Sequence, residues 1–178
     1  MILLGITGKK KSGKDAVVEM LRANITGRLV MRVGFADALK QEVAEACGVR
    51  TDYIEANKDN FRLMLQGWGT DFRRKLFGDD YWIKKYKATF YDLKKLYSNT
   101  LIVTPDVRFH NEYAAIQQLG GTIIRVRRTQ FPATNSDEHP SETEQDSFVV
   151  KRTLYNEGTL ADLEAEVKGL ISEMKLNL

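Results

Sequence analysis

The sequence predicts an α/β protein: a parallel sheet of about five strands with helices on both faces. Two observations carry this prediction. Short apolar runs alternate with segments of helical periodicity, and the runs are apolar throughout, as expected for strands buried on both sides. A turn rich in glycine also joins the first run to the first helical segment. Strand–helix alternation of this kind forms right-handed crossovers that cover both faces of a parallel sheet.

Five segments have the composition of strands, and each is bounded by turn or helix signals. The third is ended by Pro105, and the fourth follows the helix-stop pair at residues 120–121. The expected strands are residues 1–6, 29–35, 100–104, 122–127 and 148–150.

Apolar residues at helical spacing fill the intervals between these strands. Thr159 and Asp162 form an approximate capping box ahead of the last helix. A long helical stretch, interrupted near Asp79 and Asp80, occupies residues 53–97. The first expected helix begins after Lys14. The other expected helical segments are residues 39–47, 53–97, 113–119 and 160–174.

Composition excludes several classes of protein. Hydrophobic residues make up 43% and charged residues 29% of 178 residues, which excludes global disorder. A net charge of +3 is too balanced for a dedicated duplex-binding protein. The single cysteine, Cys47, excludes an intrachain disulfide framework, and only two histidines argue against structural zinc. With no membrane-length apolar run and no signal peptide, we expect a protein of a reducing cytoplasm.

Residues 8–15, Gly-Lys-Lys-Lys-Ser-Gly-Lys-Asp, fit the phosphate-binding pattern G-x-x-x-x-G-K, with Asp15 in place of the usual serine or threonine. Such a loop points backbone N–H groups at a polyphosphate, and Lys14 neutralises the β- and γ-phosphate oxygens. Asp15 would ligate Mg²⁺ or hold one of its waters. A basic turn without function is the alternative. The expected cofactor-binding residues are Gly8, Lys11, Ser12, Gly13, Lys14 and Asp15.

Charged residues also follow the third and fourth strands, at the sheet edge where such folds bind ligands. Asp106 stands where a magnesium-associated carboxylate is expected, and Arg108 could form a fork with phosphate oxygens. Arg128 is placed to follow the transferring phosphoryl group. We therefore expect Lys14, Arg108 and Arg128 to be catalytic residues, and Asp15 and Asp106 to be the residues of the metal site. A turn aspartate and solvated arginines are the alternative.

The middle of the chain is basic. Residues 60–97 hold nine Lys or Arg against four Asp or Glu, whereas residues 133–178 hold four against ten. This asymmetry favours a groove for an anion over a binding arm, and solvated helix faces are the alternative. Cations, an amide and an aromatic ring together could hold a phosphate and a base, although Trp68 could equally be core. The expected substrate-binding residues are Asp37, Lys40, Arg62, Gln66, Trp68, Asp71, Arg73, Arg108 and Glu142.

No nucleophile–base pair of the hydrolase type is present in the sequence pattern. Phosphoryl transfer to a phosphate monoester needs none, because the acceptor has a second pKa near ~6 and is largely dianionic at neutral pH. We expect one domain over residues 1–178, with a helical acceptor-binding region at about 51–97 and a lid loop at about 128–146.

Several segments in the same order resemble the phage-type deoxynucleoside monophosphate kinases: residues 6–15, 65–71 with 81–82, 102–108, 120–128, 139–142 and 156–158. The resemblance implies a P-loop kinase fold, ATP and Mg²⁺ as cofactors, and conversion of a deoxynucleoside monophosphate (dNMP) to its diphosphate. It also implies a phage protein acting in the host cytoplasm. Two departures are a shorter region before Arg62 and the insertion of residues 151–155 before Asn156-Glu157-Gly158.

The animal-type phosphomevalonate kinases are similar in the same places, and a nucleotide-dependent switch without catalysis is a third hypothesis. Gln66, Trp68 and Trp82 favour an acceptor that carries a base. We expect a small-molecule partner, no membrane and no stable nucleic-acid binding, with a homodimer left open.

Overall fold

The computed structural model describes residues 1–128 and 143–177. The chain divides into two compact units. We call residues Met1–Val33 with Lys94–Leu178 the sheet unit, and residues Gly34–Leu93 the helical unit. The expectation of one domain over residues 1–178 stays a prediction.

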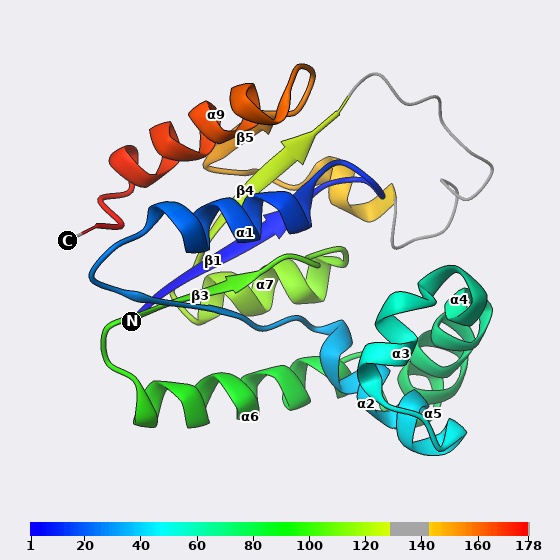
Figure 1. Ribbon diagram of the computed structural model, residues 1–178. Coiled ribbons are helices and arrows are strands. Elements are labelled where there is room, and N and C mark those ends of the chain that lie inside the picture. The colour runs from blue at the N-terminus through cyan, green and yellow to red at the C-terminus, as the bar shows by residue number, and fades with distance from the viewer. Residues whose placement is uncertain (129–142, 178) are drawn as a thin grey trace. The chain divides into compact units, whose positions relative to one another are not determined.

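The sheet unit contains one parallel sheet within the described residues. The strands run in the order β2-β3-β1-β4-β5, and every neighbouring pair is parallel (Figure 1). The α/β class and the parallel sheet are therefore confirmed. The strands are β1 (Ile2–Thr7), β2 (Leu29–Arg32), β3 (Thr100–Thr104), β4 (Thr122–Arg127) and β5 (Arg152–Tyr155).

Helices cover both faces of this sheet (Figure 1). In β1, Leu4 and Ile6 belong to a buried cluster shared with α1 and α9. The intervening Gly5 faces the other side, where a Cβ would lie 3.3 Å from Ile116 of α7. The alternation follows from the two-residue period of a strand. The helices are α1 (Lys14–Asn24), α7 (His110–Gln118) and α9 (Leu160–Glu173).

The expected strand at Phe148–Val150 is wrong. Phe148 is buried, but its ring packs against His110 and Tyr113, and Val149 is 81% exposed. The strand is β5, which begins at Arg152 and pairs with β4. Residues 151–155 therefore contain the edge strand of the sheet, which leads directly into Asn156-Glu157-Gly158.

The helical unit has its own small core, in which Val43, Ala44 and Ile54 are buried. Leu39 and Trp68 pack against them. Residues 67–74 form a π-helix, a form that the sequence pattern does not distinguish from an α-helix. The elements are α2 (Ala36–Cys47), α3 (Thr51–Ala56), α4 (Lys58–Gln66), η1 (Gly67–Arg74), α5 (Lys75–Phe77) and α6 (Tyr81–Leu96), the last of which continues into the sheet unit.

Two details at the level of single helices bear on the sequence predictions. The capping box ahead of α9 is confirmed, since Thr159 Oγ1 accepts the N–H of Asp162, and Asp162 Oδ2 accepts the N–H of Thr159 at 2.7 Å. Among the described residues, no helix has the length and apolar character that crossing a membrane requires.

The corrected position of the fifth strand can be tested by stability. Leu154 is fully buried in β5, so Leu154→Ala should lower the free energy of unfolding by about 2–5 kcal/mol. Val149→Ala, outside the strand, should change it by no more than about 0.5 kcal/mol. Chemical denaturation of both variants measures the difference. A larger loss for Val149→Ala than for Leu154→Ala would contradict the assignment of β5.

Candidate active site

The candidate site begins at the carboxyl ends of β1, β3 and β4, which lie side by side in the sheet. The loop after β1 leads into α1. The segment after β3 lies close to it, because the Val107 N–H donates to the carbonyl of Ile6 at 3.3 Å. Asp106 precedes Val107, and Arg128 directly follows β4. Parallel strands thus bring the expected phosphate-binding and metal-binding residues of the sheet unit to one edge.

The backbone of the phosphate loop adopts conformations that suit glycine. Gly8 and Gly13 have φ values of 147° and 106°, and Lys11 between them has a positive φ of 62°. A Cβ on Gly8 would collide with the carbonyl oxygen of Val126, and one on Gly13 would lie 2.5 Å from Nδ2 of Asn156. The glycines are therefore required both by the turn and by the close approach of neighbouring groups.

Two side chains of this loop have the chemistry of a phosphate site. Lys14 donates from Nζ to the carbonyl oxygens of Gly8 at 2.6 Å and Lys9 at 2.7 Å, so its ammonium lies over the loop. Ser12 is 2% exposed, and its Oγ has no hydrogen-bond partner among the described residues. A buried hydroxyl without a partner is costly unless a ligand satisfies it. These residues fit the phosphates of a nucleotide.

A buried glutamine that the sequence analysis did not single out supports the start of this loop. Gln145, in the short helix η3 (Glu144–Ser147), accepts at Oε1 from Thr7 Oγ1 at 3.0 Å and from the Gly8 N–H at 2.8 Å. Its carbonyl oxygen accepts from Arg125 of β4 at 2.8 Å. Gln145 thereby joins β1, β4 and the phosphate loop, although 137 residues separate it from Gly8.

Two further buried polar residues position the site. Asn156 follows β5 and donates from Nδ2 to the carbonyl of Ser12 at 2.9 Å, which fixes the far end of the loop. Glu112 of α7 is 3% exposed and accepts the N–H groups of Arg108 at 2.9 Å and Phe109 at 3.1 Å. The resemblance includes Asn156, but no local signal marks Gln145 or Glu112 as a support.

The charged residues expected at this end all belong to the sheet unit. Asp15 is exposed in the first turn of α1, Lys11 and Arg128 are exposed, and Asp106 and Arg108 are half-buried. Among the described residues, no cluster of three or more histidine, cysteine or carboxylate side chains is gathered as a self-sufficient metal cage. Mg²⁺ at phosphate sites ordinarily uses one or two carboxylates together with substrate phosphates, and Asp15 with Asp106 suits that pattern.

Of the expected substrate-binding residues, all except Arg108 and Glu142 belong to the helical unit. Glu142 and most of the expected lid loop lie outside the described residues. Arg62 and Gln66 are half-buried on α4. The residues of the helical unit are Asp37, Lys40, Arg62, Gln66, Trp68, Asp71 and Arg73.

Asp37, Lys40 and Asp71 already have partners within the helical unit. The Asp37 carboxylate accepts the N–H of Gly34 at 2.7 Å, at the beginning of α2. Lys40 is 11% exposed and pairs with Glu55 at 2.7 Å. Asp71 of η1 is 65% exposed and pairs with Lys75 at 2.6 Å. Their assignment to the substrate stays a prediction.

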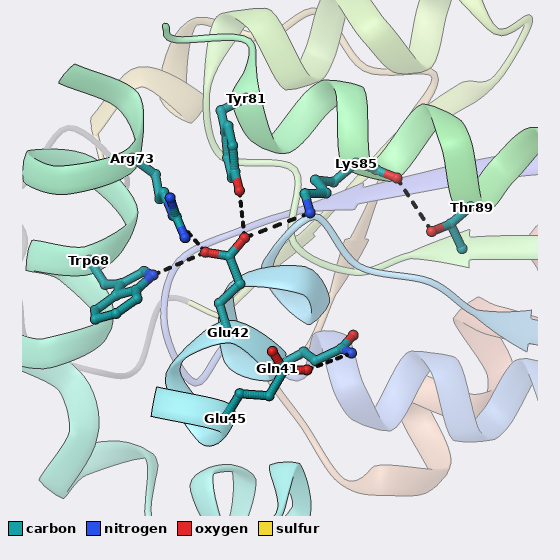
Figure 2. A network of polar contacts seen from close by, with 8 residues as sticks. All are labelled: Gln41, Glu42, Glu45, Trp68, Arg73, Tyr81, Lys85 and Thr89. Carbon is teal, nitrogen blue, oxygen red and sulfur yellow. Dashed lines mark hydrogen bonds and ion pairs between the residues drawn. The ribbon is translucent and has the colours of Figure 1, made fainter. Parts of the chain in front are cut away.

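Trp68 and Arg73 meet at a carboxylate that the sequence analysis missed. Glu42 of α2 accepts from Trp68 Nε1 at 3.1 Å, from Arg73 Nε at 2.6 Å and from the Tyr81 hydroxyl at 2.6 Å (Figure 2). Burial raises the pKa of Glu42, but these hydrogen bonds and the Arg73 charge outweigh it, so the pKa lies below its usual value. Glu42 is therefore ionised at neutral pH. Its hydrogen bond and burial raise the pKa of Tyr81, which keeps its proton.

Comparison with known proteins identifies the family. The family model described as deoxynucleotide monophosphate kinase matches residues 37–167. A protein of Acanthamoeba polyphaga mimivirus named "Putative deoxynucleotide monophosphate kinase" is 30% identical over 163 residues, covering 81% of this chain and 82% of that protein. This chain belongs to the deoxynucleotide monophosphate kinase family, as the resemblance implied. It is an enzyme, a kinase of the P-loop type whose substrate is a small nucleotide.

Similarity to solved structures extends over almost the whole chain. Shikimate kinase from Aquifex aeolicus has a TM-score of 0.52 and 13% identity, covering 99% of this chain and 100% of that one. TT1252 from Thermus thermophilus has a TM-score of 0.48 and 20% identity, covering 97% of each chain. The Aquifex comparison shows that this chain shares the fold of shikimate kinase.

The supporting role of Gln145 predicts a loss of stability. Gln145→Met keeps the length of the side chain but leaves the Gly8 N–H and the Thr7 hydroxyl buried without this acceptor. The free energy of unfolding should fall by about 1–3 kcal/mol, as measured by chemical denaturation. Gln117→Met, on the exposed face of α7, is the matched control and should cost less than about 0.5 kcal/mol. Equal stabilities for the two variants would remove Gln145 from this role.

Proposed function

We propose that this kinase transfers the γ-phosphoryl group of ATP to a deoxynucleoside monophosphate, in the presence of Mg²⁺, and forms the deoxynucleoside diphosphate and ADP. The observation that carries the proposal is the phosphate loop: left-handed backbone at Gly8 and Gly13, the Lys14 ammonium over the loop, and a Ser12 hydroxyl with no partner in the described part of the chain. The family membership supplies the acceptor class.

On the donor side, the loop N–H groups and Lys14 would hold the β- and γ-phosphates, the Ser12 hydroxyl would donate a hydrogen bond, and Lys11 and the N-terminal end of α1 would add positive potential. ATP with Mg²⁺ supplies the transferring group and part of the charge neutralisation. Asp15 and Asp106 are the carboxylates assigned to the metal. Because both are aspartates rather than hydroxyls, their contribution is negative charge and coordination, and neither needs to move a proton.

On the acceptor side, the dNMP phosphate needs cations and orientation but no general base, because its attacking oxygen is already ionised. We assign Arg108, together with Arg62 or Arg73, to that phosphate. Trp68 and Gln66 offer a stacking surface and hydrogen bonds for the base. Asp37, Lys40, Asp71 and Glu142 complete the proposed substrate-binding set.

An ADP-release assay over a panel of acceptors tests this proposal. ATP, Mg²⁺ and each dNMP, ribonucleoside monophosphate or mevalonate 5-phosphate are supplied in turn. We expect turnover with one or more dNMPs. Turnover with mevalonate 5-phosphate alone would favour a phosphomevalonate kinase-like reaction, and no turnover with any acceptor would favour a nucleotide-dependent switch.

Lys14→Ala should lower kcat by about 10³-fold or more, because the lysine meets the charge that develops on the β- and γ-phosphate oxygens. Steady-state kinetics with the accepted dNMP measures the loss. Lys168→Ala, an exposed residue of α9 paired with Glu164, is the matched control and should retain wild-type rates. Retention of more than a tenth of the rate in Lys14→Ala would contradict the assigned site.

Arg128 is the proposed contact to the migrating phosphoryl group, because it follows β4 at the edge that carries the phosphate loop. Arg128→Ala and Arg128→Lys should both lower kcat by about 10³-fold, with KM for ATP changed only a few-fold, since a planar fork is needed in the transition state. Arg127→Ala serves as the comparison. A kcat within about threefold of wild type for Arg128→Ala would refute the role, and a loss confined to Arg127→Ala would transfer it to that residue.

A further inference from the structure

The Glu42 carboxylate joins three segments of the helical unit. Its Oε2 accepts from Trp68 and Arg73 of η1, and its Oε1 accepts from Tyr81 of α6 (Figure 2). Lys85, one turn further along α6, lies 3.8 Å from the same Oε1. The Glu42 side chain is only 15% exposed. A carboxylate with this many donors is fixed in place, and it fixes its donors in turn.

Arg73 uses only one edge of its guanidinium for this contact. The contact to Glu42 is made through Nε, and the two Nη atoms have no hydrogen-bond acceptor among the described residues. The guanidinium carbon lies between 5.0 and 5.8 Å from the ring centroids of Trp68, Phe72, Phe77 and Tyr81. Aromatic rings at this distance hold the guanidinium without consuming its N–H donors.

This geometry differs from that of an ion pair whose role is only to brace the helices. A bracing arginine gains most from a bidentate contact, in which two parallel N–H groups meet one carboxylate. Here the edge formed by the two Nη atoms, which suits a phosphate, is left for another acceptor. The charges of Glu42, Arg73 and Lys85 sum to +1, so an anion is still attracted to the group.

We propose that Glu42 is a positioning residue: it holds Arg73 so that the Nη edge of the guanidinium receives the phosphate monoester of the acceptor nucleotide. This inference rests on the proposed function and selects Arg73, rather than Arg62, as the arginine of the helical unit that binds the acceptor phosphate. Trp68 shares the carboxylate, so the ring expected to face the base and the arginine expected to face the phosphate are oriented by one group.

Steady-state kinetics of Glu42→Gln tests the inference. The amide keeps the shape but loses the charge and part of the hold on Arg73. We expect KM for the dNMP to rise about tenfold or more, with KM for ATP within about twofold of wild type. Glu45→Gln, an exposed carboxylate on the same helix, is the matched control and should behave as wild type. An unchanged dNMP KM, or an equal rise in the KM for ATP, would overturn the proposal.

A double-variant cycle separates positioning from bracing. Arg73→Ala should raise the dNMP KM at least as much as Glu42→Gln, and adding Glu42→Gln to it should cause no further rise. An additional tenfold rise in the double variant would show that Glu42 does not act through Arg73. If the Glu42→Gln variant does not fold, the Arg73→Lys variant tests the proposal instead. Lysine keeps the positive charge but lacks the planar guanidinium, so a dNMP KM equal to that of the wild type would overturn the proposal.

Calorimetric binding of the dNMP without ATP distinguishes this inference from the proposed function. Weakened binding to Glu42→Gln, relative to wild type, supports the inference even in the absence of turnover. Turnover by the wild type together with an unchanged Kd for Glu42→Gln would overturn the inference and leave the proposed function intact. A wild type that neither binds nor phosphorylates any dNMP would overturn both.

Discussion

The conformation of the phosphate loop is the constraint on which the rest of the sheet unit depends. Its glycines hold left-handed backbone against neighbours that leave no room for a side chain, and its two ends are held by Gln145 and Asn156. Both supports come from the last third of the chain. The order of the sheet follows the same logic, because β1 lies between β3 and β4 and so places Asp106 and Arg128 beside the loop. Parallel pairing therefore converts three distant sequence segments into one site.

Under the proposed function, the helical unit has a different task, which is to hold cations ready for a dianionic acceptor phosphate. An arginine tied up completely by carboxylates would be neutralised, and one left without support would lose side-chain entropy on binding. Glu42 and the rings around Arg73 provide an intermediate arrangement, in which orientation is fixed and the Nη donors are retained. The π-helix at residues 67–74 places Trp68 and Arg73 at the same carboxylate. Helices of this type occur frequently at functional sites.

Much of the fold could be predicted from the sequence, because buried parallel strands and a glycine loop leave strong local signals. The fifth strand could not: β5 is an edge strand with the polar residues Arg152 and Thr153, whereas Phe148 is apolar because it packs under α7. Long-range polar supports were missed for a related reason. Nothing near Glu42 or Gln145 in the sequence distinguishes them from exposed helix residues, since Trp68 lies 26 residues from Glu42 and Gly8 lies 137 residues from Gln145. The phosphate loop, in contrast, is marked by its own spacing.

The central claim is that the γ-phosphoryl group of ATP is transferred to an acceptor nucleotide rather than to water. Phosphorus NMR of the wild-type protein with ATP, Mg²⁺ and an accepted dNMP tests it most directly, because nucleoside mono-, di- and triphosphates and inorganic phosphate have separate resonances. The predicted result is two nucleoside diphosphates formed for each ATP and each dNMP consumed, with no inorganic phosphate in excess of the no-enzyme control. ADP accompanied by inorganic phosphate, with the dNMP signal unchanged for every base, would contradict the account.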